Sequence, residues 1–79
     1  VRVFPNPFDD QFTVNVLLPQ EESMLLRLMS PQGHILASEV LESETYQRSF
    51  DLSGYPSGLY LVRIYYGAGG EVTEKVIKK

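Results

Sequence analysis

The chain has 79 residues and no cysteine, and its 7 basic and 10 acidic side chains give a formal net charge of −3. A chain of this length forms one domain with a modest core, because it buries only somewhat more than ~60% of the surface that it exposes when unfolded. The lack of cysteine excludes a disulfide framework and cysteine-ligated zinc. The weak negative charge excludes a strongly basic nucleic-acid surface, and no apolar run reaches the ~18 residues of a membrane helix. We therefore expect one folded domain over residues 1–79, with no nucleic acid as partner.

Alternating apolar residues predict β-strands along most of the chain. In the run of residues 12–18, Phe12, Val14 and Val16 are two residues apart, so their side chains share one face of a strand. Turn residues separate such runs, as in Ser30-Pro31-Gln32-Gly33, where Pro and Gly stand at places that a type I turn accepts. The expected strands cover residues 1–4, 11–18, 23–30, 34–41, 44–51, 59–66 and 71–78.

About seven short strands separated by turns predict an all-β domain, an immunoglobulin-like antiparallel sandwich of two sheets. The segment 34–46 leaves a second interpretation open, because its Leu, Val and Glu spacing also suits a short helix. Tyr60 follows a long corner and is expected to form a tyrosine corner, with a buried ring and a hydroxyl bonded to residues 52–57. Tyr65 and Tyr66 resemble a sugar-binding platform, but alternation sends them to opposite faces, so one of them is expected in the core.

The sequence shows no catalytic constellation. The single histidine, His34, follows a predicted turn and has no partners in the sequence for catalysis or metal binding. The acidic pairs Asp9-Asp10 and Glu21-Glu22 lack the alternating Asp and Gly of a calcium loop, so we interpret them as solvated charges. We predict no enzyme, no cofactor and no metal site.

The last predicted strand closes on Lys75-Val76-Ile77-Lys78-Lys79. Lysines on a terminal strand oppose edge-to-edge pairing, and composition alone favours that interpretation. They also suit an address read by a receptor. In that case we expect Glu71, Lys75 and Lys78 on one charged face, with Val72 and Val76 or Ile77 anchoring the strand to the core.

Taken in order, these motifs resemble the C-terminal sorting domain of the type IX secretion system of Bacteroidetes. Members of that family open with a Pro-Asn-Pro-like motif, continue through a strand that runs into a turn with Gly, and close on a Lys-hydrophobic-hydrophobic-Lys strand. At two positions of the turn, Ser30 and His34 stand where many members have Asp and Arg. The matching segments are Pro5-Asn6-Pro7-Phe8, the run 28–33 with Gly33, Pro56-Ser57-Gly58-Leu59-Tyr60 continuing through Arg63, and Lys75-Val76-Ile77-Lys78.

The resemblance implies a secretion signal that belongs to a larger exported protein. The cargo would fold in the periplasm and cross the outer membrane to the cell surface or the medium because this domain is recognised. Implied partners are the outer-membrane machinery, a sortase-like transpeptidase that removes the domain by a cut upstream of Val1 or near it, and the upstream cargo domain. Strand addition at the closing strand, residues 71–78, is the expected mode of recognition, and Lys75, Val76, Ile77, Lys78 and Lys79 are the expected recognition residues. A structural role is expected for Pro5, Asn6, Pro7, Phe8, Gly33, Pro56, Ser57, Gly58, Tyr60 and Arg63.

Two alternatives follow from the residues alone. The chain also suits a generic immunoglobulin-like accessory or carbohydrate-binding module of an extracellular protein. Self-association through the terminal strands is the third interpretation, because exposed sheet edges pair readily.

Overall fold

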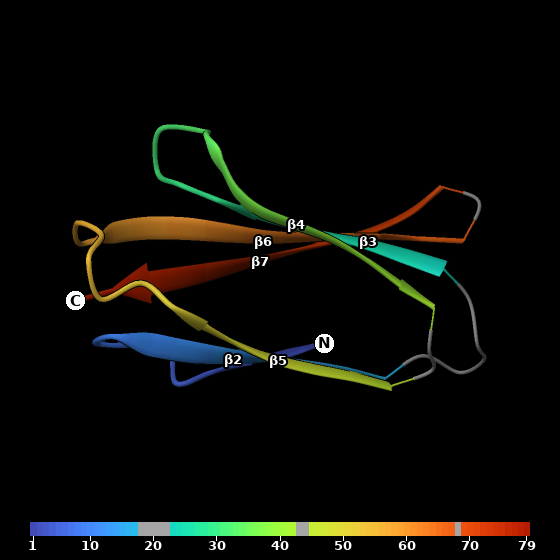
Figure 1. Ribbon diagram of the computed structural model, residues 1–79, viewed down its shortest axis with the longest axis horizontal. Coiled ribbons are helices and arrows are strands. Elements are labelled where there is room, and N and C mark those ends of the chain that lie inside the picture. Colours follow the sequence, from blue (N-terminus) through green and yellow to red (C-terminus); the bar gives the residue numbers. More distant parts are fainter. Residues whose placement is uncertain (18–22, 43–44, 68) are drawn as a thin grey trace.

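Seven strands form two antiparallel sheets that pack face to face (Figure 1). The computed structural model describes residues 1–17, 23–42, 45–67 and 69–79. The predicted acidic pair Glu21-Glu22, and the expected strand ends at 18 and 44, lie outside these residues. The strands are β1 (Arg2–Phe4), β2 (Gln11–Leu17), β3 (Ser23–Met29), β4 (Ile35–Glu42), β5 (Thr45–Asp51), β6 (Gly58–Tyr66) and β7 (Gly70–Lys78).

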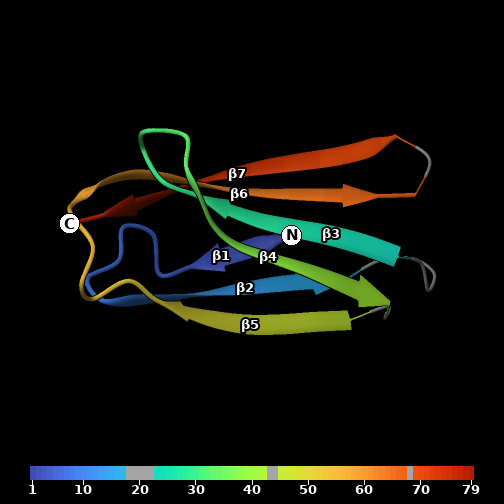
Figure 2. The same ribbon diagram turned by 45° about the horizontal axis from the view of Figure 1, so that its top comes forward.

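The order of the strands confirms the predicted sandwich. One sheet has the order β1-β2-β5 and the other β4-β3-β6-β7, and Figure 2 shows the two layers separately. The chain changes sheet between β2 and β3, between β4 and β5, and again between β5 and β6, as in immunoglobulin-like topologies. The alternative of a helix in the segment 34–46 is wrong, because residues 35–42 form the strand β4, which pairs antiparallel with β3.

The core lies between the two sheets and follows the alternation of the sequence. In β2 the side chains of Phe12, Val14 and Val16 are at most 1% exposed, whereas the residues between them face outward. Each such buried side chain contributes about 1.5–3 kcal/mol relative to an exposed one. The other buried apolar residues are Phe8, Met24, Leu26, Leu28, Phe50, Leu52, Tyr60, Val62, Ile64 and Val76.

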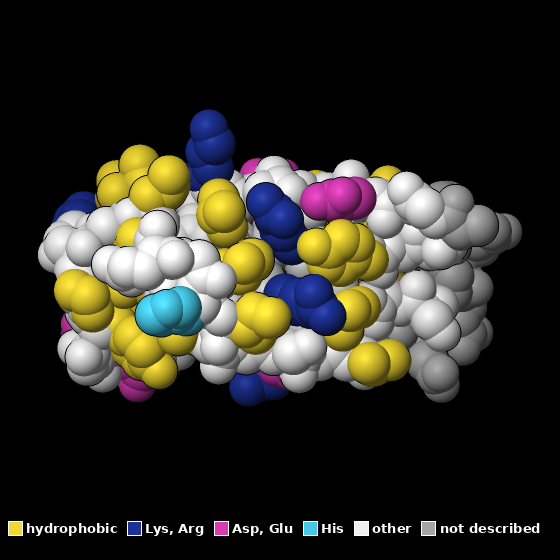
Figure 3. Space-filling view, turned by 90° about the horizontal axis from the view of Figure 1, so that it is seen from above, with side chains coloured by type: hydrophobic (Ala, Val, Ile, Leu, Met, Phe, Trp, Pro, Cys, Tyr) yellow, Lys and Arg dark blue, Asp and Glu magenta, His cyan; other side chains and the backbone are white. Residues whose placement is uncertain are grey.

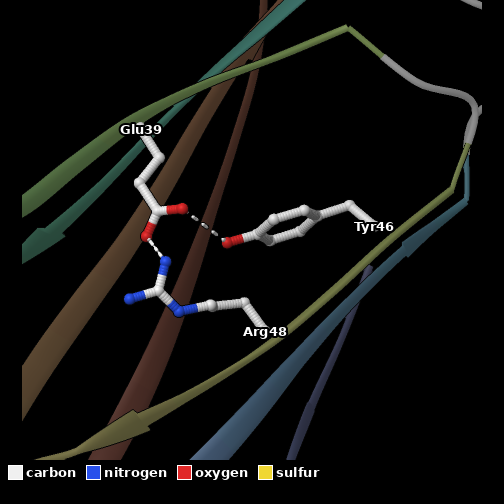
Figure 4. A network of polar contacts seen from close by, with 3 residues as sticks. All are labelled: Glu39, Tyr46 and Arg48. Atoms are coloured by element: carbon white, nitrogen blue, oxygen red, sulfur yellow. Dashed lines mark hydrogen bonds and ion pairs between the residues drawn. The ribbon is translucent and has the colours of Figure 1, made fainter.

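A polar network joins the sheets where the edge strands β4 and β5 approach each other (Figure 4). The Tyr46 hydroxyl donates to Glu39 Oε1 at 3.4 Å, and the Arg48 guanidinium pairs with Glu39 Oε2. Burial, and then the negative charge of Glu39, raise the pKa of Tyr46 to about 12. The hydroxyl is therefore protonated at neutral pH and can donate. An ion pair and a hydrogen bond thus connect the two sheets along this side of the sandwich.

The β3–β4 hairpin turns as the sequence predicts. Gly33 N–H donates to the Ser30 carbonyl at 2.9 Å, and Gly33 has a φ of +91°, which favours glycine. The Ser30 hydroxyl, 3.0 Å from the His34 nitrogen, accepts that N–H and fixes the exit from the turn. His34 itself is exposed, as expected. The described residues include no helix that is long and apolar enough to cross a membrane.

Candidate functional site

The segment 5–8 lies along the outer edge of β7, far from it in sequence. Phe8 N–H donates to the Ile77 carbonyl at 2.8 Å, and Lys79 N–H donates to the Phe8 carbonyl at 2.9 Å. These two bonds form a parallel bridge between Phe8 and Lys78. The peptide bonds Phe4–Pro5 and Asn6–Pro7 are both cis. The start of the chain is thereby joined to its last residues.

Asn6 adds two hydrogen bonds to the same edge. Its Nδ2 donates to the Lys75 carbonyl at 2.9 Å, and its Oδ1 accepts the Ile77 N–H at 3.0 Å. The carboxamide offers a donor and an acceptor side by side, as a peptide group does, and the two partners fix which atom is oxygen. Because Pro5 and Pro7 have no N–H, the side chain of Asn6 takes the place of a strand residue here.

Phe8 fixes this segment to the core. Its side chain is 1% exposed, and its ring centroid lies 4.9 Å from that of Phe12 in a tilted arrangement. Phe12 in turn stacks on Phe50 at 5.6 Å. An aromatic pair of this geometry is worth about 0.5–1.5 kcal/mol beyond its buried area. The hydrogen bonds to β7 are therefore made by a segment that the core holds in place.

The corner before β6 contacts the end of β7 from the other side. The Ser57 hydroxyl donates to the Lys79 carbonyl at 2.7 Å. The Tyr60 hydroxyl donates to the Pro56 carbonyl at 2.6 Å, its ring is fully buried, and burial raises its pKa. The predicted tyrosine corner is confirmed. It fixes the backbone just before Ser57, so we call Asn6, Phe8 and Ser57, together with residues 75–79, the C-terminal clamp.

Gly58 is required at this corner for two reasons. Its φ of +151° lies in the region that favours glycine, and a Cβ atom built on it would lie 3.0 Å from Pro31 Cγ. Pro31 belongs to the β3–β4 turn that ends at Gly33. That turn therefore packs against the corner that carries Ser57.

The clamp occupies half of the outer edge of β7. In an antiparallel strand, alternate residues direct their N–H and C=O groups to opposite sides. The Lys75 carbonyl, both backbone groups of Ile77 and the Lys79 N–H are all bonded to the segment 5–8. By the same alternation Glu71 and Thr73 direct their backbone groups to this edge, where the described residues provide no partner. The edge open to another strand is thus the first half of β7.

The predicted charged face of β7 needs one correction. Val76 is buried and Val72 is half-buried, so both anchor the strand to the core as expected. Lys78 lies on the same side as Val76, because it is two residues further along, and it does not share a face with Glu71 and Lys75. Ile77 lies with Lys75 on the outer face, with 48% of its surface exposed, and is not an anchor.

Most of the predicted site residues meet at one end of the sandwich. The clamp brings together segment 5–8, the corner 56–60 and residues 75–79, and the turn at Gly33 adjoins them. Arg63 is the exception, because it lies in the middle of β6 on the outer face of its sheet. The partners of Asn6 were not predicted from the sequence, although an amide placed between two prolines, which cannot donate a backbone hydrogen bond, is a signal for them.

The described residues hold no group of three or more His, Asp or Glu side chains able to bind a metal ion. The molecule is a small immunoglobulin-like sandwich whose two chain ends are locked together by hydrogen bonds. The family model of the secretion system C-terminal sorting domain matches residues 2–79, and the chain belongs to this family. No curated protein sequence matches the chain.

Members of this family are sorting signals and not a class of enzymes. Membership implies a type IX signal attached to a cargo polypeptide, interaction with the type IX secretion machinery, and export across the outer membrane to the cell surface or the medium.

Proposed function

We propose that this domain is the C-terminal address of a larger exported protein and that the secretion machinery reads residues 75–79. The observation that carries the proposal is the clamp, which fixes the backbone of these residues from two sides. Lys75, Ile77 and Lys79 remain exposed while their backbone is held. A receptor therefore meets a short row of cationic and apolar side chains in one conformation, which lowers the entropic cost of binding.

The clamp also bears on how the segment is read. Strand addition was the expected mode, but over residues 75–79 the backbone groups of the edge are already bonded. Recognition in the clamped state thus relies on side chains. Addition of a strand to this half of β7 requires the displacement of Asn6 and Phe8, and Phe8 is held by the core. Self-association through the same half of β7 meets the same obstacle.

The later steps of export belong to this proposal as well. The cargo precedes Val1, passes through the periplasm, and is released from the domain by a sortase-like transpeptidase that cuts upstream of Val1 or near it. The position of β1 supports an accessible cut, because Val1 immediately precedes an edge strand and is 43% exposed. A linker at that point is accessible to a protease without unfolding of the core.

The carbohydrate-binding alternative finds less support. Tyr66 packs against the core, whereas Tyr65 lies on the outer face of the four-stranded sheet. The two rings therefore do not form a common platform for a sugar.

The test is fusion of residues 1–79 to a folded periplasmic reporter in a bacterium with an active type IX system. We expect the reporter at the cell surface, and its retention in the periplasm in the same strain without that system. Equal surface display in both strains, or retention in both, contradicts the proposal.

A further inference from the structure

The outer face of the four-stranded sheet carries apolar side chains around two central arginines. Figure 3 looks onto this face, where dark blue Lys and Arg side chains lie among yellow hydrophobic ones. We define the arginine face by the outward residues of β3 and β6: Leu25, Arg27, Met29, Leu61, Arg63 and Tyr65. We propose that this face binds a protein of the secretion machinery whose surface presents carboxylates among aliphatic side chains. This inference rests on the proposed function and identifies a second surface for it.

The two arginines are placed against the usual rules of sheet pairing. Arg27 and Arg63 lie directly opposite each other in the β3–β6 ladder, and like charges in such positions are destabilising. The Nε atom of each is buried and has no hydrogen-bond partner among the described residues. The Arg27 guanidinium lies 5.8 Å from the ring centroid of Tyr65, which orients it but does not neutralise it.

The same fold neutralises a third arginine in another place. Arg48 pairs with Glu39 across the sandwich. Among the described residues no such carboxylate pairs with Arg27 or Arg63. The unpaired charges of Arg27 and Arg63 in the middle of an apolar face are explained if a partner protein supplies the carboxylates, because the ion pairs then form only in the complex.

The surroundings of the arginines are those of a protein interface. Large apolar side chains on the neighbouring edge strands are open to solvent: Val40 is 70% exposed, Ile35 is 53% exposed, and Ile77 is 48% exposed. Protein–protein interfaces are enriched in Arg, Tyr and Met, and their strongest contacts are Arg and aromatic residues surrounded by less critical apolar ones. An anionic lipid surface, in contrast, is recognised by clusters of about 4–8 Lys or Arg side chains, more than this face carries.

The charge of the face identifies the chemistry of the partner. Arg27 and Arg63 lie on it, and the outward side of the neighbouring strand β7 adds Lys75 and one carboxylate, Glu71. The outer face of this sheet thus holds three of the 7 basic residues of a chain whose net charge is −3. The planar guanidinium forms two parallel hydrogen bonds to a carboxylate, so Asp or Glu side chains are its best protein partners.

A second copy of the domain does not fit this description. The middle of its other outer face holds Thr13, Asn15, Gln47 and Ser49, which bond to one another across β2 and β5 and carry no charge. That face belongs to the sheet that contains β1, so a cargo joined through Val1 leaves from the layer opposite the arginine face. The arginine face thus stays accessible to a separate protein.

The test uses residues 1–79 fused to the periplasmic reporter. The double variant Arg27→Gln with Arg63→Gln removes both charges and keeps polar side chains, and Arg2→Gln on the other sheet is the control. We expect the double variant to reduce surface display at least about tenfold with its melting temperature maintained, and the control to leave display unchanged. If the folded double variant is displayed at the wild-type level, the proposed binding role of the arginine face is wrong, whereas the proposed function is unaffected. Failure of the unaltered fusion to be displayed overturns both.

Photo-crosslinking identifies the partner. A photoreactive phenylalanine derivative replaces Val40, which pairs with Leu25 of the arginine face, or, as control, Leu17 on the outer face of the other sheet, since these residues are 70% and 71% exposed. We expect position 40, and not position 17, to crosslink to a secretion-machinery protein through a peptide rich in Asp or Glu, and this crosslink to disappear in the double variant. A crosslink to lipid, to lipopolysaccharide, to a second copy of the fusion or to a peptide without carboxylates overturns the inference.

Discussion

Replacement of Asn6 by Ala tests the clamp at a single side chain. The change removes the hydrogen bond from Nδ2 to the Lys75 carbonyl and the one from the Ile77 N–H to Oδ1, which measure 2.9 and 3.0 Å. Each hydrogen bond contributes about 0.5–1.5 kcal/mol net, and water replaces part of both at this exposed site. We therefore expect a loss of ~1 kcal/mol of unfolding free energy, equivalent to a fall of roughly 4–8 °C in Tm.

Amide hydrogen exchange by NMR locates this loss. Ile77 loses the Asn6 oxygen, the one acceptor that the described part of the chain offers its N–H, so its exchange should accelerate about tenfold or more. The Lys79 amide should remain protected, because its acceptor is the backbone of Phe8 and the core holds that residue. In the unaltered domain both amides should exchange more slowly than Thr73, which lies on the open half of the same edge.

Two variants control the experiment. Asn6→Asp keeps an oxygen for the Ile77 N–H but sets an anionic oxygen in place of the donor to the Lys75 carbonyl, so Ile77 should stay more protected than in Asn6→Ala. Asn15→Ala removes an exposed interstrand bond to Gln47 elsewhere, and it should leave Ile77 unaffected. The clamp is refuted if Ile77 exchanges as fast as Thr73 in the unaltered domain, or if Asn6→Ala leaves its rate unchanged.

Three further predictions concern stability. Tyr60→Phe leaves the Pro56 carbonyl without its donor and should cost about 1–2 kcal/mol in denaturant unfolding; an unchanged midpoint would exclude a structural role for the hydroxyl. Gly58→Ala introduces a Cβ at a φ of +151° and 3.0 Å from Pro31, and should cost about 1–3 kcal/mol, whereas Gly54→Ala, with open space around it, serves as the mild control. The pKa of Tyr46 is raised from 10.0 to about 12, so its stabilising effect is fully present below pH 10 and is lost as the pH rises through 12. The free energy of unfolding, measured from pH 8 to 12, should fall less steeply for Tyr46→Phe, and equal slopes would count against a raised pKa of Tyr46.

Local patterns in the sequence predict much of this fold. The alternation in β2 predicts that Phe12, Val14 and Val16 face the core together, because side chains two residues apart in a strand point to the same side. The corner before Tyr60 also carries its own signal, since its hydrogen bond to Pro56 spans only four residues. Elements whose cause is local were therefore predictable with their position and role.

Contacts that depend on how the two sheets pack could not be predicted from the sequence. The partners of Asn6 lie 69 and 71 residues away, and only the packing of the two sheets brings them into reach. The pairing of Glu39 with Arg48 likewise depends on which strands lie opposite each other across the sandwich. The predicted grouping of Lys78 with Lys75 failed for a simpler reason, because the two stand three positions apart and residues at an odd offset in a strand point to opposite faces.

The most direct test of the proposed address is the double variant Lys75→Ala with Lys79→Ala, which removes both exposed lysines of the clamped segment, in the fusion of residues 1–79 to a periplasmic reporter. Both substitutions retain the backbone bonds of the clamp, so the melting temperature should stay close to that of the unaltered domain. The matched control, Glu71→Ala with Thr73→Ala, changes the unclamped half of the same strand. We predict that the lysine variant keeps the folded reporter in the periplasm while the control reaches the cell surface. Surface display of the lysine variant at the level of the unaltered fusion would contradict the claim that residues 75–79 are read.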